Sequence, residues 1–228
     1  MFARLALCAS LFLMAFGLHA GEAPALKKGE RIVFFGDSIT AGGSGPKGYI
    51  TVIKNTLTEK HKDLGIETIN AGISGHKVPD LQKRLQKDVL DKKPTIVFIY
   101  IGINDVWHSE HGKGTSKEDF ESGLKDLIAK ITAGGARVIL CTATVIGEKT
   151  DASNKLDVML EEYCGISRKV AEDTKTPLCD LHKAFQNYLK VNNTKNLDKG
   201  VLTGDRVHLN DAGNKLVAET MLASLGVK

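Results

Sequence analysis

Three residue types that can carry out nucleophilic catalysis occur in two short stretches of the sequence. In IVFFGDSIT, an apolar run breaks off at a glycine and leads into Asp37 and Ser38. In GDRVHLNDAG, Asp205 and His208 lie three residues apart, close enough for one loop to aim both side chains at another loop. A serine hydroxyl needs a neighbouring base, and a carboxylate can hold the imidazole tautomer that accepts the serine proton. The residues Ser38, His208 and Asp205 therefore suggest a catalytic triad.

Each of these residues also has an ordinary structural explanation. A serine after a strand often caps the next helix, an aspartate suits an Asx turn, and a loop histidine can simply face solvent. A helix N-terminus nevertheless favours negative charge by roughly 0.3 to 1 kcal/mol, which would suit a reacting hydroxyl at Ser38. We expect Asp37 to tie down the turn before Ser38 by hydrogen bonds.

Two further residues could supply hydrogen-bond donors to an oxyanion. Removing one such donor typically costs about 10² to 10³ in rate. Gly72, in NAGISG, would let the backbone approach a ligand closely, and Asn104, in GIND, carries a side-chain amide. Each could also be a plain turn residue. The coincidence of four such features, all in predicted loops, favours the catalytic interpretation.

The elements that must position these loops alternate along the chain. Apolar, β-branched runs that predict strands lie at residues 32–35, 66–69, 95–101, 137–143 and 176–181. Segments with helical spacing lie at residues 49–59, 78–90, 117–131, 154–173 and 212–225. Such alternation is typical of a parallel sheet with helices on both faces. We predict an α/β domain with a flavodoxin-like strand order, 2-1-3-4-5, and a ligand site beyond the carboxyl ends of the strands.

Length and composition fit a single globular domain. The chain has 228 residues, of which 42% are hydrophobic and 25% charged, and its net charge is +4. The basic residues are scattered and interleaved with acids, without the clustering on one face that nucleic-acid binding requires. No nucleic-acid partner is predicted.

The first twenty residues have the layout of a secretory signal peptide. Arg4 precedes an apolar run, and the small residues Ala20 and Ala23 offer two cleavage positions. The run is short for a membrane span, which needs about 20 residues, so an uncleaved anchor is the second interpretation. We predict a signal peptide at 1–20, a catalytic domain at 21–228 and an exported protein, periplasmic or extracellular, with no stable membrane insertion after cleavage.

Neither a metal nor another cofactor is predicted. The WHSEH stretch brings His108, Glu110 and His111 together, but in a glycine-flanked segment rather than at the i, i+4 spacing of metalloprotease helices. A metal-dependent hydrolase is the less favoured reading. The cysteines beyond the signal segment match no zinc or CxxC spacing, and a Cys164–Cys179 disulfide stays open. These cysteines are Cys141, Cys164 and Cys179.

FGDSIT, NAGISG, GIND and DRVH, in this order, resemble the four sequence blocks of the SGNH hydrolases, also called GDSL esterases and lipases. The resemblance covers residues 32–213. It implies a three-layer α/β/α sandwich, Ser38 as nucleophile, and Asp205 and His208 as its triad partners. It also implies an oxyanion hole formed by the Ser38 N–H with Gly72 and Asn104. The last block has Arg206 where many members have glycine, and Leu209 where many have proline.

The resemblance implies a serine esterase. The absence of a long apolar lid segment favours short acyl groups, above all acetyl, on a small-molecule or carbohydrate ester. Trp107 and Tyr49 could stack on a sugar ring or could pack against loop backbone. A lysophospholipase-like or thioesterase activity of the same family, and a noncatalytic carbohydrate-binding protein, are the alternatives. The sequence predicts no oligomeric state.

Overall fold

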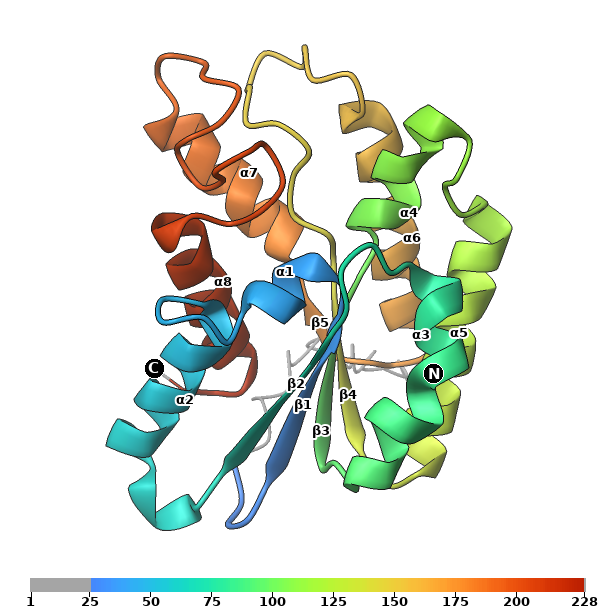
Figure 1. Ribbon diagram of the computed structural model, residues 1–228, viewed down its shortest axis with the longest axis vertical. Coiled ribbons are helices and arrows are strands. Elements are labelled where there is room, and N and C mark those ends of the chain that lie inside the picture. Colours follow the sequence, from blue (N-terminus) through green and yellow to red (C-terminus); the bar gives the residue numbers. More distant parts are fainter. Residues whose placement is uncertain (1–25, 228) are drawn as a thin grey trace, which may run out of the picture.

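Five short strands lie side by side in one parallel sheet, in the order β2-β1-β3-β4-β5. This order comes from a computed structural model that describes residues 26–227 (Figure 1). The strands are β1 (Arg31–Gly36), β2 (Glu67–Gly72), β3 (Ile96–Tyr100), β4 (Arg137–Cys141) and β5 (Leu178–Cys179). The predicted strand order is confirmed. The predicted signal peptide lies outside the described residues.

Helices cover both faces of the sheet, as the alternating pattern predicted (Figure 1). One face carries α2 (Tyr49–Lys60), α7 (Leu181–Asn192) and α8 (Asp211–Ser224). The other carries α3 (Val78–Asp88), α5 (Lys117–Ala133) and α6 (Asp157–Asp173). Two short helices, α1 (Ser38–Gly42) and α4 (Ile103–Trp107), directly follow β1 and β3. Three 3-10 turns complete the elements: η1 (Lys62–Leu64), η2 (Leu90–Lys92) and η3 (His108–His111).

The register of the sheet brings the carboxyl ends of three adjacent strands, β2, β1 and β3, to the same level. Gly36 of β1 is paired with Gly72 of β2 and with Tyr100 of β3. Ser38 and Asn104 lie in the segments that follow β1 and β3, and Gly72 is the last residue of β2. The predicted edge of the sheet is thus the one at which these segments meet.

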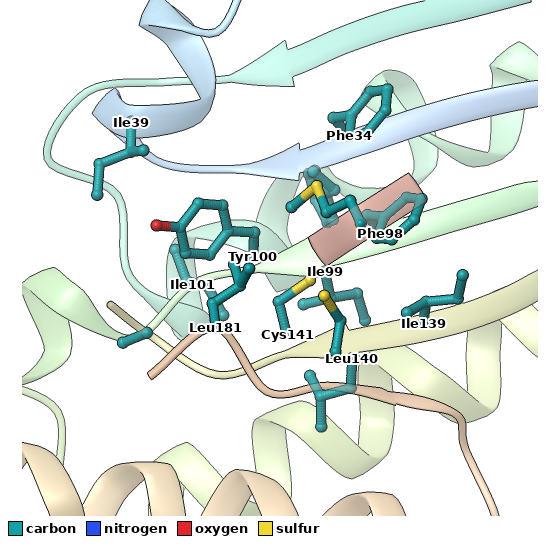
Figure 2. Close-up of a cluster of buried hydrophobic side chains, with 14 of the residues drawn as sticks. Phe34, Ile39, Phe98, Ile99, Tyr100, Ile101, Ile139, Leu140, Cys141 and Leu181 are labelled. Atoms are coloured by element: carbon teal, nitrogen blue, oxygen red, sulfur yellow. The ribbon is translucent and has the colours of Figure 1, made fainter. Parts of the chain in front are cut away.

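The core is built on β1 and β3, whose central residues are buried on both faces. Phe34 and Phe98 stack with their ring centroids 5.3 Å apart, and Ile99, Leu140 and Leu181 lie in the same cluster (Figure 2). Each fully buried side chain of this size stabilises the fold by roughly 1.5 to 3 kcal/mol. The strands that carry the site are therefore anchored in the best-packed part of the molecule.

Several elements differ from the sequence prediction. Strand β2 runs to Gly72 instead of ending at residue 69, and the short helices α1 and α4 were not predicted. Helix α6 begins at Asp157 rather than at residue 154, because the Asn154 side chain donates to the carbonyl of Lys149 and folds into the preceding loop. Helix α7 was not predicted. Its N-cap is Asp180, and its buried residues include Leu181, Phe185 and Leu189, a four-residue spacing that would have revealed it.

The three cysteines in the described part of the chain are free and buried. The open possibility of a Cys164–Cys179 disulfide is not realised in this structure. Within residues 26–227, no helix has the length and apolar character needed to cross a membrane.

Candidate active site

Ser38 is presented by the sharp turn from β1 into α1. Asp37 is the N-cap of this helix, and its carboxylate accepts a hydrogen bond of 2.9 Å from the Ile39 N–H. Ser38 is the first helical residue, and in the described part of the chain its N–H donates to no protein acceptor. The predicted role of Asp37 in the turn is supported by this hydrogen bond. A free N–H and a hydroxyl therefore stand together at Ser38.

A chain of two hydrogen bonds connects Ser38, His208 and Asp205. The Ser38 Oγ lies 2.9 Å from His208 Nε2, and His208 Nδ1 lies 2.7 Å from Asp205 Oδ2. With Nδ1 protonated towards the carboxylate, Nε2 is the ring atom able to accept the serine proton. The three side chains that the sequence selected thus meet in the arrangement that activates a serine hydroxyl.

The loop that carries Asp205 and His208 is closed by its own hydrogen bonds. Asp205 Oδ1 accepts from the N–H groups of Val207 and His208 at 3.1 and 2.8 Å. Thr203 and Leu209 form an isolated antiparallel bridge across the base of the loop. One carboxylate oxygen of Asp205 therefore holds the loop, while the other faces the imidazole.

The charge state of Asp205 suits this role. Partial burial works to raise the pKa of Asp205, but the hydrogen bonds from His208 and Val207 outweigh it and hold the pKa below its ordinary value. Asp205 is therefore ionised wherever His208 needs an anionic partner.

A buried glutamate that the sequence analysis missed supports the same loop. Glu148 is fully buried, and its two carboxylate oxygens accept from the N–H groups of Val201 and Leu202 at 2.8 and 2.7 Å and from the Thr203 hydroxyl at 2.7 Å. Glu148 ends the TATVIGE segment that follows β4. The only sequence signal for a role was a charged residue beside an apolar run. Glu148 therefore fixes the chain just before Asp205.

Arg206, between Asp205 and His208 in the sequence, adopts a backbone conformation that favours glycine. Its φ is 88°, and its guanidinium pairs with Asp198 at 3.0 Å. Glycine adopts a positive φ most easily, which explains why many SGNH hydrolases have glycine at this position. The arginine is accommodated, and the contact between Asp205 and His208 is kept.

The structure does not support a place for Gly72 in the oxyanion hole. The Gly72 N–H already donates to the side-chain oxygen of Asn70 at 2.8 Å. A Cβ at this position would lie 2.1 Å from the backbone nitrogen of Ala41, so glycine is needed for the close contact between β2 and α1. Three residues further on, Gly75 has φ 78°, and among the described residues its N–H has no acceptor. The Gly75 N–H is therefore a free backbone donor of this loop, whereas the Gly72 N–H is not.

Asn104 is buried at the start of α4, directly after β3. Its amide nitrogen donates to the carbonyl of His76 at 3.0 Å, which leaves the second N–H of the amide for another acceptor. Asn104 is thus held by the loop that follows β2. The amide of Asn104 and the N–H groups of Ser38 and Gly75 are free donors in the segments that follow β3, β1 and β2.

Trp107 lines the surface beside the triad, whereas Tyr49 does not. The Trp107 ring is edge-on to the His208 ring, with centroids 6.4 Å apart, and both Trp107 and Asp205 line a hollow of about 140 Å³. Tyr49 is fully buried, and its hydroxyl donates to Thr40 Oγ1. The suggestion that Tyr49 stacks on a sugar was therefore wrong.

Other hollows and polar clusters lie away from the triad. A larger cavity of about 750 Å³, between α6 and α7, is lined by His182 and Glu161 and by none of the triad residues. Across residues 26–227, no group of three or more His, Cys, Asp or Glu side chains is arranged to hold a metal ion. The WHSEH residues lie on η3 and the end of α4.

The fold and the site together define an SGNH-type carboxylic ester hydrolase. Residues 34–216 match the model of the GDSL-like lipase/acylhydrolase family, and the chain belongs to this family. An acetylxylan esterase of Geobacillus stearothermophilus is 32% identical over 215 residues, which cover 87% of this chain and 94% of that protein.

Solved structures show the same relationship. The crystal structure of an acetyl xylan esterase superposes with a TM-score of 0.82 and 44% identity, covering 86% of this chain and 99% of that one. The crystal structure of the Geobacillus stearothermophilus acetylxylan esterase superposes with a TM-score of 0.79 and 30% identity, covering 89% and 97% of the two chains. A more distant relative, an isoamyl acetate-hydrolysing esterase 1 homologue of Rattus norvegicus, is 25% identical and covers 82% and 78%.

Proposed function

We propose that this hydrolase removes acetyl groups from a carbohydrate, with Ser38 as nucleophile, His208 as general base and Asp205 as the carboxylate that orients His208. The observation that carries the proposal is the pair of contacts from Ser38 Oγ to His208 Nε2 and from His208 Nδ1 to Asp205 Oδ2. A hydroxyl held 2.9 Å from an imidazole nitrogen is within reach of proton transfer without any rearrangement.

The reaction follows from this geometry. Ser38 Oγ attacks the acetyl carbonyl carbon while its proton passes to His208 Nε2, and the carbonyl oxygen becomes an oxyanion. The N–H groups of Ser38 and Gly75 and the Asn104 amide stabilise that oxyanion. When the tetrahedral intermediate collapses, the sugar oxygen leaves and takes the proton from His208. Water, deprotonated by His208, then attacks the acyl carbon, and Ser38 Oγ leaves with the proton from His208 as acetate is released.

The names of similar proteins support both the residues and the acyl group. Structures of the Geobacillus stearothermophilus acetylxylan esterase include variants described as catalytic mutants in which a serine, an aspartate or a histidine is replaced by alanine. The aspartate and histidine there are three positions apart, as Asp205 and His208 are here. We extend the acetyl group and the sugar from these relatives to this chain.

The surroundings of the triad agree with a sugar as the group that carries the acetyl ester. A hollow of about 140 Å³ lies beside Asp205. The half-buried Trp107 at its edge offers an aromatic face on which a sugar ring can stack.

We further propose that the enzyme acts outside the cytoplasm after cleavage of the signal peptide. The layout of residues 1–20 supports export. So does the 36% identity, over 127 residues, to an uncharacterised lipoprotein of Bacillus subtilis. Mass analysis of the protein recovered after export would give its first residue, expected to be Gly21 or Pro24.

The test compares acetyl and octanoyl esters of p-nitrophenol and then an acetylated xylo-oligosaccharide. We expect turnover of the acetyl ester to exceed that of the octanoyl ester, and release of acetate from the oligosaccharide. A fluorophosphonate should label Ser38, as shown by mass analysis of the modified peptide, and abolish activity. Ser38→Ala should remove both, while Ser122→Ala, at an exposed position on α5, should keep both.

Three results would each overturn a part of the proposal. Preference for octanoyl esters would exclude the acetyl assignment. Full activity in Ser38→Ala would exclude the mechanism. Absence of turnover and of labelling would leave a binding protein with the fold of an esterase.

A further inference from the structure

The guanidinium of Arg84 lies beneath the carboxyl ends of β1 and β2. Arg84 belongs to α3, and its side chain is only 10% exposed. Its Nη2 donates to the carbonyl of Gly36 at 2.7 Å, and its Nη1 donates to the carbonyl of Ala71 at 2.8 Å. The planar guanidinium of Arg84 therefore bridges the ends of β1 and β2, where the chain leaves the sheet.

These two carbonyls belong to the segments that carry the proposed chemistry. Gly36 is two residues before Ser38, and the carbonyl of Ala71 lies on the peptide that leads into Gly72 and the loop with Gly75. The position of these strand ends fixes where the hydroxyl of Ser38 and the free backbone donors lie.

A third hydrogen bond extends this network to Asn104. The Nε of Arg84 donates to His76 Nδ1 at 3.0 Å, and the carbonyl of the same His76 accepts the Asn104 amide at 3.0 Å. Acceptance at Nδ1 requires that this ring nitrogen carry no proton. Burial, and then the charge of Arg84, lower the pKa of His76 from its ordinary value, which keeps the ring neutral.

The guanidinium itself has little freedom to move. Asp88, one turn along α3, accepts from Nη1 at 3.0 Å, and the Phe35 ring lies below the guanidinium carbon at 4.5 Å from its centroid. An arginine offers five N–H donors in one rigid plane, whereas a lysine ammonium is a point charge on a flexible stem. Among the common cationic side chains, only arginine can reach all these acceptors at once.

We infer that Arg84 is a positioning residue of this esterase, which sets kcat by holding the Ser38 turn, the loop after β2 and the Asn104 amide in one arrangement. It contacts no reacting atom. This inference rests on the proposed function, since it concerns the same site. A misplacement of about 1 Å between reacting groups can cost about 10² in rate, so a support of this kind should be visible in kcat.

The experiment measures kcat and KM for p-nitrophenyl acetate in Arg84→Met and Arg84→Lys. Each preparation is titrated with a fluorophosphonate to completion, so that rates are expressed per molecule that carries a reactive Ser38. We expect Arg84→Met to lose about 10² in kcat with KM within about threefold of wild type. Arg84→Lys should recover part of the loss, because an ammonium can reach one carbonyl but lacks the fork.

The control is Lys83→Met on the same helix. The Lys83 side chain is 75% exposed and pairs only with the neighbouring Asp80. Within residues 26–227 it makes no hydrogen bond to the loops, so its substitution should leave kcat and KM close to wild type. Asp88→Asn removes only the carboxylate that steadies the guanidinium, so it should give a smaller loss of kcat than Arg84→Met. It provides the test of the inference if Arg84→Met fails to fold.

The inference is overturned if Arg84→Met, or Asp88→Asn where Arg84→Met does not fold, keeps wild-type kcat per labelled site. It is also overturned if the loss appears in KM alone. The proposed function fails in a different way, namely if the wild-type enzyme is not labelled at Ser38 or if Ser38→Ala remains active. The two failures are therefore separable.

Discussion

At the scale of single residues, the imidazole of His208 is held between a carboxylate and a hydroxyl. The two carboxylate oxygens of Asp205 have different partners. Oδ1 accepts hydrogen bonds from backbone N–H groups of its own loop, and Oδ2 faces His208 Nδ1. An amide in place of the carboxylate would preserve the shape of this arrangement. It would not preserve the preference for a proton on Nδ1.

The first prediction at this scale concerns Asp205→Asn. We expect the loop to keep its conformation and kcat to fall by about 10⁴-fold, because His208 would be held in the tautomer that cannot accept the Ser38 proton. Steady-state kinetics with p-nitrophenyl acetate checks this. Asp211→Asn, at an exposed carboxylate that pairs with Lys47, is the matched control and should retain wild-type rates. A drop of less than tenfold in Asp205→Asn would show that His208 does not depend on this carboxylate.

At the scale of elements, β2 and α1 touch through their backbones. The Cα of Gly72 lies so close to Ala41 that no side chain fits between them. Asn70 fills the space beside this contact, and its amide donates to the carbonyls of Thr40 and Ala41 and to the Ser44 hydroxyl. The helix that begins with Ser38 is thereby fixed against the neighbouring strand.

Gly72→Ala tests this contact. The added methyl group would meet backbone atoms at 2.1 and 2.5 Å, which cannot move aside as a side chain could. We expect a loss of unfolding free energy above about 2 kcal/mol, since overpacking against backbone costs at least as much as overpacking in a core. Thermal unfolding measures this loss. Gly42→Ala is the control, because a Cβ there meets no atom within 4 Å and the change should be close to neutral. Equal stability of the two variants would contradict the packing role.

The sequence predicted the elements better than it predicted the contacts between them. The order of the strands followed from their spacing and apolar character, and Ser38, Asp205 and His208 stood out because their types suit one reaction. The roles of Gly72 and Tyr49 could not be predicted in this way. Whether a glycine frees an N–H or admits a neighbouring helix, and whether a ring turns inward, depends on packing between distant segments. Arg84 and Glu148 escaped notice for the same reason, since Arg84 donates to backbone carbonyls and Glu148 accepts from backbone N–H groups.

At the scale of the whole molecule, two buried carboxyl groups make stability depend on pH. Burial raises the pKa of Asp37 to about 7 and that of Asp105 to about 6, from ordinary values of 3.8. The unfolded chain releases these protons near pH 4, whereas the folded protein keeps them until pH 6 to 7. The folded state binds more protons over this interval, so these two groups lower stability as pH rises from about 4 to about 7.

Asp105→Asn separates the contribution of Asp105, since a neutral amide needs no proton to be buried. Relative to wild type, we expect the variant to gain stability as pH is raised from 4 to 8, by on the order of 2 to 3 kcal/mol for a pKa difference of this size. Melting temperatures measured from pH 4 to pH 8 give this difference. Asp63→Asn, at an exposed position, should show none. A difference that stays flat with pH would mean that Asp105 is ionised at all these values.

The long sequence separation between the reacting groups has a consequence for the cell that makes the protein. Ser38 and His208 are 170 residues apart. At roughly 5 to 20 residues per second, a ribosome completes the serine segment roughly 10 to 30 s before the histidine segment. During that interval the nascent chain carries a hydroxyl with no base to activate it. If the proposed export takes place in the unfolded state, the polypeptide would remain equally inert until it folds outside, and the acetyl esters of the compartment in which it is synthesised would be spared.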